Sequence, residues 1–400
     1  MSAFDIAIVG GGMAGSVAAL SLARLGRRVA LLAPPAAVED KRTTALMDQS
    51  IRFMERLGLW DRIAPSAAAL STMRIIDGTN RLLRAPTVSF RSSEVGLEAF
   101  GYNIPNAALL AVLGEAVTHE GNITLLPQAA EHVDLLAEGV QIALQDGSRI
   151  SAELVVAADG RKSKMRDNAG IGVRHWSYPQ TAIVLNFSHD LPHGNISTEF
   201  HTESGPFTQV PLPGNRSSLV WVRKPTEADV LMALSPEELS LRVEKQMQSM
   251  LGKVIVEPDV QAWPLSGMMA HRFGKGRLVL AGEAGHVFPP IGAQGFNLSL
   301  RDIIHLNDLI SDLKGEPIPE SIGDRFDRRR RADVMTRTAG VDLLNRSLLS
   351  DFLPTQMVRA AGLHVLSALP PLRALFMREG IEPGRGLSAI GDALRGKLRR

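Results

Sequence analysis

The sequence predicts an α/β protein in which a domain built on a parallel sheet is interrupted by an inserted antiparallel sheet and followed by C-terminal helices. Three observations predict this fold class. A strand–helix–strand unit occupies residues 4–33, and two further buried strands, at 154–157 and 278–281, each run into a glycine-containing turn. A strand-rich block separates these last two strands. From Asn297 onward the spacing of apolar residues is mostly helical.

Composition limits the chemistry that this chain can perform. Of its 400 residues, 45% are hydrophobic and none is cysteine. These values are ordinary for a soluble globular protein with room for two domains. Without cysteine, disulfides, thiolate nucleophiles, Cys-ligated zinc and iron–sulfur clusters are excluded, so redox chemistry requires a bound cofactor. No metal site is predicted. We expect a cytoplasmic protein, because neither a signal peptide nor an apolar membrane span is visible.

The opening unit predicts two adjacent parallel strands. FDIAIV at 4–9 is a short apolar run, and a helix at 14–25 follows a glycine turn. RVALLA at 28–33 is the second strand, ended by two prolines. A strand, a helix and a strand within about thirty residues form the crossover that joins parallel strands.

The remaining elements follow in order. Apolar periodicity predicts helices over 50–63 and 109–119. Short apolar runs predict a small meander at 123–126, 140–144 and 149–150. Strands of the inserted sheet are expected at 183–187, 205–212 and 217–222. We therefore expect a discontinuous parallel-sheet domain (1–72, 100–175 and 265–340), an inserted substrate domain (73–99 and 176–264) and a C-terminal helical segment (341–400).

The first turn carries a phosphate-binding pattern. Gly10-x-Gly12-x-x-Gly15 lies directly between a strand and a helix, which is the context of a Rossmann-like dinucleotide site. The glycines allow a tight turn, close approach of a pyrophosphate and close packing of the helix. The acidic residue that often binds the ribose is absent, since Ala33 ends the second strand. Either ribose recognition differs, or Glu39 or Asp40 reaches back.

Two later motifs also follow buried strands. Asp159-Gly160 opens a basic segment that ends at Arg166, a pattern able to position a pyrophosphate. Gly282-Glu283-Ala284-Gly285-His286 precedes a glycine-rich stretch that enters a helix carrying Asp302. Free amides at such a helix start stabilise negative charge. We expect His286 to have a structural role rather than a catalytic one.

With its three motifs in this order, the sequence resembles the flavin-dependent aromatic hydroxylases that share the p-hydroxybenzoate hydroxylase fold. Within them it is most similar to the ubiquinone-biosynthesis hydroxylase family. The resemblance spans nearly the whole chain and is carried by Gly10 to Gly15, Arg42 to Leu46, Leu57 to Trp60, Gly101-Tyr102, Ala158 to Arg166, Gly205-Pro206, Pro211-Leu212, Gly282 to Asp302, Arg328 to Asp333 and Leu344 to Arg346.

This resemblance implies that all three motifs bind FAD. By it, the pyrophosphate lies on the first turn, Arg42 contacts FAD, Asp159 serves the pyrophosphate region and NAD(P)H, and Glu283 holds the ribityl chain. Two departures stand out: Glu283 replaces the usual Asp, and Asn106 stands in a segment where the family often has Arg or Gln. The implied cofactor residues are Gly10, Gly12, Met13, Ala14, Gly15, Arg42, Asn106, Asp159, Gly160, Gly282, Glu283, Pro290, Gly292, Gln294, Gly295, Phe296 and Asn297.

The same resemblance implies an FAD-dependent monooxygenase. It would use NAD(P)H and O2, through a flavin C4a-hydroperoxide, to hydroxylate the ring of a polyprenyl phenol in ubiquinone biosynthesis. No catalytic base is predicted. The segment Phe207 to Leu212, with Trp221, is expected either to line the substrate pocket or to be plain core. The alternatives are a non-catalytic scaffold of a quinone-biosynthesis complex and another FAD-dependent oxidoreductase, of prenyl-reductase or halogenase type.

The C-terminal segment is basic. Residues 321–400 hold 15 Lys/Arg and 8 Asp/Glu, a net charge of +7. Because the whole chain has a net charge of +2, the first 320 residues have a net charge of −5. Within 387–400, Ile390, Leu394 and Leu398 recur at spacing four among basic residues. This pattern predicts either a helix on a membrane surface or an ordinary frayed helix. The partners expected are a prenylated phenol, a peripheral membrane contact and a quinone-biosynthesis complex; nucleic acid is not expected.

Overall fold

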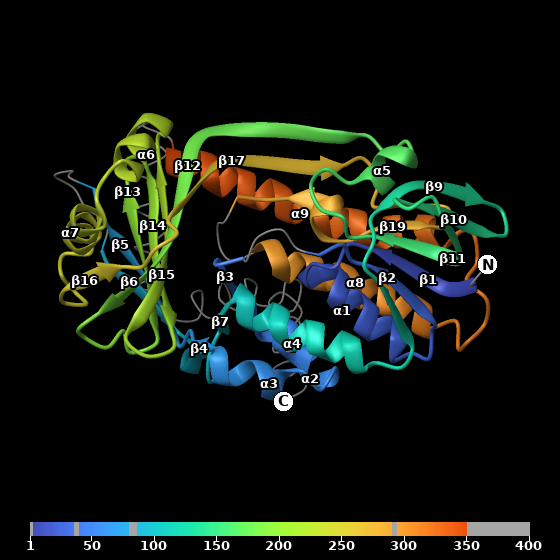
Figure 1. The fold of residues 1–400 in the computed structure, drawn as a ribbon. Helices are drawn as coiled ribbons and strands as arrows, with labels where there is room; N and C mark the ends of the chain where they lie inside the picture. Colours follow the sequence, from blue (N-terminus) through green and yellow to red (C-terminus); the bar gives the residue numbers. More distant parts are fainter. Residues whose placement is uncertain (1–2, 36–39, 80–85, 290–293, 350–400) are drawn as a thin grey trace, which may run out of the picture.

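The computed structural model describes residues 3–35, 40–79, 86–289 and 294–349 (Figure 1). An eight-stranded sheet forms one half of the molecule, in the order β18-β19-β11-β1-β2-β8, with β9 and β10 continuing from β11. Its strands are β1 (Ala3–Val9), β2 (Val29–Leu32), β8 (Ile123–Leu126), β9 (Ala130–Leu136), β10 (Gly139–Leu144), β11 (Arg149–Ala157), β18 (Gly274–Lys275) and β19 (Leu278–Leu280).

The centre of this sheet is parallel, as the opening unit predicts. β1 pairs in parallel with β2 and β11, and β11 with β19. Both faces are covered, so alternate residues of β1 enter different cores. Ile6 and Ile8 pack with the helices, while Ala7 and Val9 pack toward β9 and β10. The helices on the first face include α1 (Met13–Ala23), α4 (Asn106–His119) and α8 (Gln294–Ser311).

A nine-stranded sheet forms the other half, in the order β20-β17-β12-β15-β14-β13-β5-β6 with β16 beside β12. It is antiparallel except where β13 and β5 pair in parallel. Its strands are β5 (Thr72–Asp77), β6 (Val88–Arg91), β12 (Val173–His189), β13 (Ile196–Thr202), β14 (Gly205–Leu212), β15 (Arg216–Arg223), β16 (Val254–Val256), β17 (Gln261–Ala270) and β20 (His286–Val287).

Two long strands connect the halves. β12 and β17 belong to the nine-stranded sheet and pair along much of their length. Both extend from that sheet toward α5 (Lys164–Asn168), which lies beside the parallel sheet (Figure 1). Beyond them, α6 (Pro225–Met232) and α7 (Pro236–Gln246) cover one face of the nine-stranded sheet. The final described helix, α9 (Ile322–Leu349), passes beneath both strands. No helix within the described ranges is both long enough and apolar enough to cross a bilayer.

A small third sheet lies between the halves. It consists of β3 (Thr43–Met47), β7 (Gly101–Pro105) and β4 (Ala68–Ala69). Thr43 and Asn103 both reach Ser218 of β15, at 3.1 and 3.2 Å. The Asn186 amide donates to the carbonyl oxygen of Lys41. The nine-stranded sheet is therefore fixed to the segment that carries Arg42.

Three predicted elements differ from the structure. The helix expected over 50–63 is two helices, α2 (Asp48–Arg56) and α3 (Trp60–Ile63), because Gly58 adopts a φ of 54° between them. The strand at 123–126 is not part of the meander, since β8 pairs in parallel with β2. The meander instead consists of β9, β10 and β11. The runs predicted separately at 149–150 and 154–157 both belong to β11.

Candidate cofactor site

The first glycine turn is shaped by backbone contacts that a side chain would block. Gly10 has a φ of 116°, and a Cβ there would lie 2.3 Å from the carbonyl oxygen of Ala158. A Cβ on Gly15 would lie 1.8 Å from the carbonyl oxygen of Gly10. Gly12 differs, because a Cβ there would meet nothing within 4 Å. Its lack of a side chain leaves open the space in front of the turn.

That open space faces the N-terminus of α1. Gly12 is the N-cap residue, and no side chain accepts a hydrogen bond from the first turn. The first amides of a helix have no partner within the helix, and the helix dipole adds partial positive charge there. Met13 and Ala14 belong to this first turn. The arrangement suits a diphosphate.

Asp159 lies beside the same turn, because β11 is the parallel neighbour of β1. Its Oδ2 accepts a hydrogen bond from the Met165 amide, whereas its buried Oδ1 has no partner among the described residues. Burial, partly offset by a hydrogen bond from Ser163, raises the pKa of Asp159. A buried oxygen without a partner is costly. The site therefore fits a cofactor that brings both a diphosphate and a hydrogen-bond donor.

The expected acidic ribose partner does not appear at the end of β2. A Cβ on Gly11 would lie 2.3 Å from the Cβ of Ala33, so a small residue is needed on each side. Asp40 does not reach back, since its carboxylate binds Arg42 and Asn106. The other candidate, Glu39, lies outside the described residues. No acidic residue of the described part of the chain therefore stands at the end of β2.

Arg42 is held by Asp40 in a two-pronged ion pair. Its Nε and Nη2 lie 2.8 and 2.7 Å from the two carboxylate oxygens. Burial alone would raise the pKa of Asp40, but hydrogen bonds from Arg42 and Asn106 hold it below its usual value. The hydrogen bond to Asp40 raises the pKa of Arg42, with a smaller contribution from the charge of Glu283. The ring of Trp263 lies 5.6 Å from the guanidinium carbon.

Asn106 is part of this arrangement and already has two side-chain partners. It is buried at the start of α4, donates to Asp40 at 2.9 Å and accepts from the Thr44 hydroxyl at 2.6 Å. Its side chain therefore acts through Asp40 on Arg42. The sequence could not indicate this pairing, because Asp40 and Asn106 are 66 residues apart.

The third motif begins with a turn that a buried carboxylate anchors. Gly282 has a φ of 63°, and its amide donates to the buried Asp302 at 3.0 Å. Glu283 follows with its side chain half-exposed and ion-paired to Arg161, 3.1 Å away. Asp159, the glycine turn and Glu283 thus come from the carboxyl ends of three adjacent parallel strands, β11, β1 and β19. Ligands bind at such an edge in open α/β sheets.

The start of α8 holds the strand that follows Arg42. The Asn297 amide donates to the Ala45 carbonyl at 2.7 Å and accepts from the Met47 amide at 2.9 Å and the Ser50 hydroxyl at 2.6 Å. Asn297 therefore fixes β3. Phe296 packs against the helix-covered core, and the Gly295 carbonyl accepts from Ser299. Gln294 begins the helix, while Pro290 and Gly292 lie outside the described residues.

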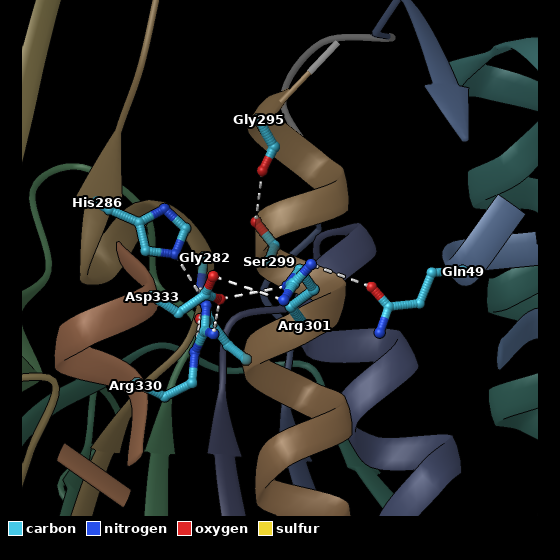
Figure 2. A network of polar contacts seen from close by, with 9 residues as sticks. Gln49, Gly282, His286, Gly295, Ser299, Arg301, Arg330 and Asp333 are labelled. Carbon is cyan, nitrogen blue, oxygen red and sulfur yellow. Dashed lines mark hydrogen bonds and ion pairs between the residues drawn. The ribbon is translucent and has the colours of Figure 1, made fainter. Parts of the chain in front are cut away.

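Behind the third motif lies a buried network of charges (Figure 2). Asp302 of α8 accepts from Nε2 of His286 at 2.7 Å and from Nε of Arg330 at 2.9 Å, and it also receives the Gly282 amide. Arg330 is fully buried and also pairs with Asp333, which pairs in turn with Arg301.

The network includes His286 and adds a residue, Arg330, that the sequence did not single out. Burial opposes ionisation of Asp302, but the charges of His286 and Arg330 outweigh it and lower its pKa. His286 is 2% exposed and bound to Asp302, a placement that suits the structural role expected for it. Arg330 was missed because it stands in a run of four arginines in which nothing distinguishes the buried member.

His305, close to this network on α8, should make stability depend on pH. Burial, and then the charges of Arg330, Arg329 and Arg301, lower its pKa to about 4. Between about pH 6.5 and 4 the unfolded chain binds a proton that the folded chain refuses, so stability falls as pH falls. Allowing for the partial exposure of His305, we expect a loss on the order of 1–2 kcal/mol across that window.

Urea unfolding at about pH 5 and about pH 7.5 measures this loss. We expect His305→Gln to remove most of the difference between the two pH values. The matched control is His132→Gln, because His132 is half-exposed on β9. An unchanged difference in the His305 variant would contradict the assignment.

Known proteins share both the sequence and the fold. Residues 3–339 match the family described as FAD binding domain. The chain is 32% identical to the ubiquinone hydroxylase UbiL of Rhodospirillum rubrum, covering 94% of this chain and 89% of that protein. It is 30% identical to the 3-demethoxyubiquinol 3-hydroxylase of Escherichia coli, covering 90% and 93%.

A solved structure adds the fold. The p-nitrophenol 4-monooxygenase PnpA of Pseudomonas putida superposes with a TM-score of 0.78 at 19% identity, covering 97% of this chain and 99% of that one. A likeness at this identity concerns the architecture alone. Together with the two relatives and the family match, these findings show that the chain belongs to the FAD-binding family and, within it, to the ubiquinone-biosynthesis hydroxylases of the flavin-dependent aromatic monooxygenases.

Proposed function

We propose that this protein is an FAD-dependent monooxygenase that hydroxylates the aromatic ring of a polyprenyl phenol in ubiquinone biosynthesis. The observation that carries the proposal is the convergence of the glycine turn, the partnerless oxygen of Asp159 and the Gly282-Glu283 turn at one sheet edge. Two relatives with these activities in their names align over nine-tenths of the chain.

The residues of this edge have distinct tasks in the proposal. The turn Gly10 to Gly15, with the amides of Met13 and Ala14, binds the diphosphate. Asp159 accepts a hydrogen bond next to it, with Gly160 completing the turn. Glu283 exchanges Arg161 for a ribityl hydroxyl. Other contacts to FAD are assigned to Arg42, Asn106, Gly282, Pro290, Gly292, Gln294, Gly295, Phe296 and Asn297.

Bound at this edge, FAD would supply the redox chemistry that couples oxidation of NAD(P)H to insertion of one oxygen atom of O2 into the substrate ring, with the other atom released as water. The chain's own part is to bind and orient the two partners and to exclude water. The N-terminus of α8 would offer free amides and a partial positive charge that stabilise negative charge on the reduced flavin ring.

The test uses the purified protein with FAD restored. We expect a yellow protein that oxidises NAD(P)H faster when 2-geranylphenol is added and that incorporates one atom from 18O2 into the product. A protein that takes up no FAD would favour the scaffold alternative. Uptake of FAD and NAD(P)H oxidation without oxygen incorporation would favour a reductase.

Location at a membrane surface and membership of a quinone-biosynthesis complex are finer proposals. Both are supported by the prenylated substrate class and by the basic, amphipathic pattern at 387–400, which lies outside the described residues. We expect deletion of residues 388–400 to reduce co-sedimentation with anionic liposomes. Unchanged co-sedimentation would remove the membrane proposal and leave the hydroxylase proposal intact.

A further inference from the structure

The two faces of the nine-stranded sheet are unlike. One face is fully buried under α6 and α7 and includes Phe187, Phe207 and Trp221. The sequence left open whether Phe207 and Trp221 line a substrate pocket, and the structure places both in this core. The opposite face, here called the open face, is buried at Ala182, Ser218 and Val222. Its other residues are half-buried: Val184, Asn186, Ser197, Glu199, His201, Thr208, Val210 and Val220.

The open face is directed toward the proposed cofactor site. Asn186 and Ser218 lie on it, and both contact the segment that begins at Lys41 and continues into β3. The same β3 is held on its other side by Asn297 of the third motif. A ring lying on this face would therefore lie on the side of the sheet that meets the residues assigned to FAD.

Chemically, the open face combines three valines with polar side chains, among which is one acid–base pair. Val184, Val210 and Val220 supply the apolar surface that a prenylated ring requires. Glu199 and His201 stand two residues apart on β13, so their side chains share this face. His201 Nε2 lies 2.8 Å from Glu199 Oε1, and the Thr208 hydroxyl donates to Glu199 Oε2 at 3.3 Å.

This pair is accessible, and acidic residues lie around it. The side chains of His201 and Glu199 are 13% and 29% exposed, so a ligand can reach them while water is partly excluded. In the neutral imidazole, Nε2–H donates to Glu199, which leaves the Nδ1 lone pair as an acceptor. Asp77 of β5 is in register with His201, and Glu203 follows it on the chain. Arg74 of β5 is in register with Thr198, on the opposite face.

We propose that His201 accepts the phenolic proton of the substrate and that Glu199 is the positioning residue that orients and stabilises it. The step breaks the phenol O–H bond and places the proton on Nδ1. The electron pair stays on the phenolate oxygen and enriches the ring carbon that is to be hydroxylated. This assignment rests on the proposed hydroxylase function and supplies the base that the sequence analysis left unassigned.

The direct test reads the ionisation of a bound phenol without turnover. The probe is 2-geranyl-4-nitrophenol, whose phenolate absorbs visible light, titrated with the FAD-loaded enzyme. On the wild type we expect half-ionisation about one pH unit or more below that of the free probe. In His201→Asn the pH of half-ionisation of the bound probe should return to that of the free probe or rise above it. In Glu199→Gln this pH should lie between the values for the wild type and for His201→Asn.

Turnover of 2-geranylphenol gives the second readout. We expect kcat to fall about 100-fold or more in His201→Asn, with KM and FAD content within about twofold of the wild type. The matched control is His132→Asn, because His132 and Asp134 form an equivalent pair two residues apart on β9, 3.2 Å apart and half-exposed.

The outcomes separate the two proposals. If the probe ionises in both His201→Asn and Glu199→Gln as it does in the wild type, the roles assigned to His201 and Glu199 are wrong. A wild-type enzyme that ionises the probe but hydroxylates no phenol would keep the pair and overturn the hydroxylase function. An FAD-loaded enzyme that does not bind the probe would overturn both.

Discussion

Replacing Gly12 by alanine is expected to remove FAD binding without disturbing the fold, whereas the same change at Gly15 should prevent folding. A Cβ on Gly12 meets no protein atom within 4 Å, so the protein without FAD tolerates it. It would occupy the space that the diphosphate needs and separate it from the α1 amides. Losing about two charge-assisted hydrogen bonds weakens FAD binding about 100-fold or more.

At Gly15 the obstacle is the protein itself. A Cβ there would lie 1.8 Å from the Gly10 carbonyl oxygen, so α1 would have to move away from β1. We expect a loss of more than about 4 kcal/mol, within the range of severe core mutations. Gly114→Ala is the matched control, because Gly114 is exposed in α4 with open space around it. That change should stabilise the helix by up to about 1 kcal/mol.

Two measurements distinguish these variants. Urea unfolding of the FAD-free proteins gives the stability, and quenching of flavin fluorescence gives the FAD dissociation constant. Wild-type FAD affinity in Gly12→Ala would show that the diphosphate does not lie on this turn. Normal stability in Gly15→Ala would show that the close contact with Gly10 is not needed.

The second large effect is expected at Arg330. Arg330→Met removes the fully buried cation that pairs with Asp302 and Asp333, and it leaves the buried Asp302 without its arginine partner. Breaking a buried ion pair by removing one partner costs about 3–5 kcal/mol. Because Asp302 also holds the Gly282 amide, FAD affinity should fall as well.

The neighbouring arginine provides the control. Arg329 is exposed and pairs with Asp308 at 3.2 Å, so Arg329→Met should cost at most about 1 kcal/mol. Arg330→Met combined with Asp302→Asn should lose less stability than the sum of the two single changes, since the partners share one network. Additive losses would mean that the two residues act independently.

Sequence patterns predict the parts of this protein that depend on local chemistry. Apolar runs such as Phe4 to Val9 indicate buried parallel strands, and the glycine spacing indicates the turn. The break at Gly58 was missed because apolar periodicity continues across it. β8 was misplaced because a short apolar run does not reveal which strand it pairs with.

The site is less predictable, since its contacts join distant segments. Asp40 and Asn106 meet across 66 residues, and Asn297 reaches β3 across 250. Glu199 and His201 were within reach of sequence reasoning. A Glu-x-His pair around a core Phe200 on a strand places both polar groups on the face opposite that core.

The contact between Asp302 and Arg330 also bears on when the cofactor site can form during synthesis. The turn at Gly282 is anchored by Asp302, whose charge is balanced by a residue near the end of the described chain. β1 likewise lacks one of its two parallel neighbours until β11 has been made. The glycine turn therefore leaves the ribosome before the other two motifs, but the site is complete only once α9, the final described helix, has been made. FAD capture is thus expected to follow translation of the chain rather than accompany it.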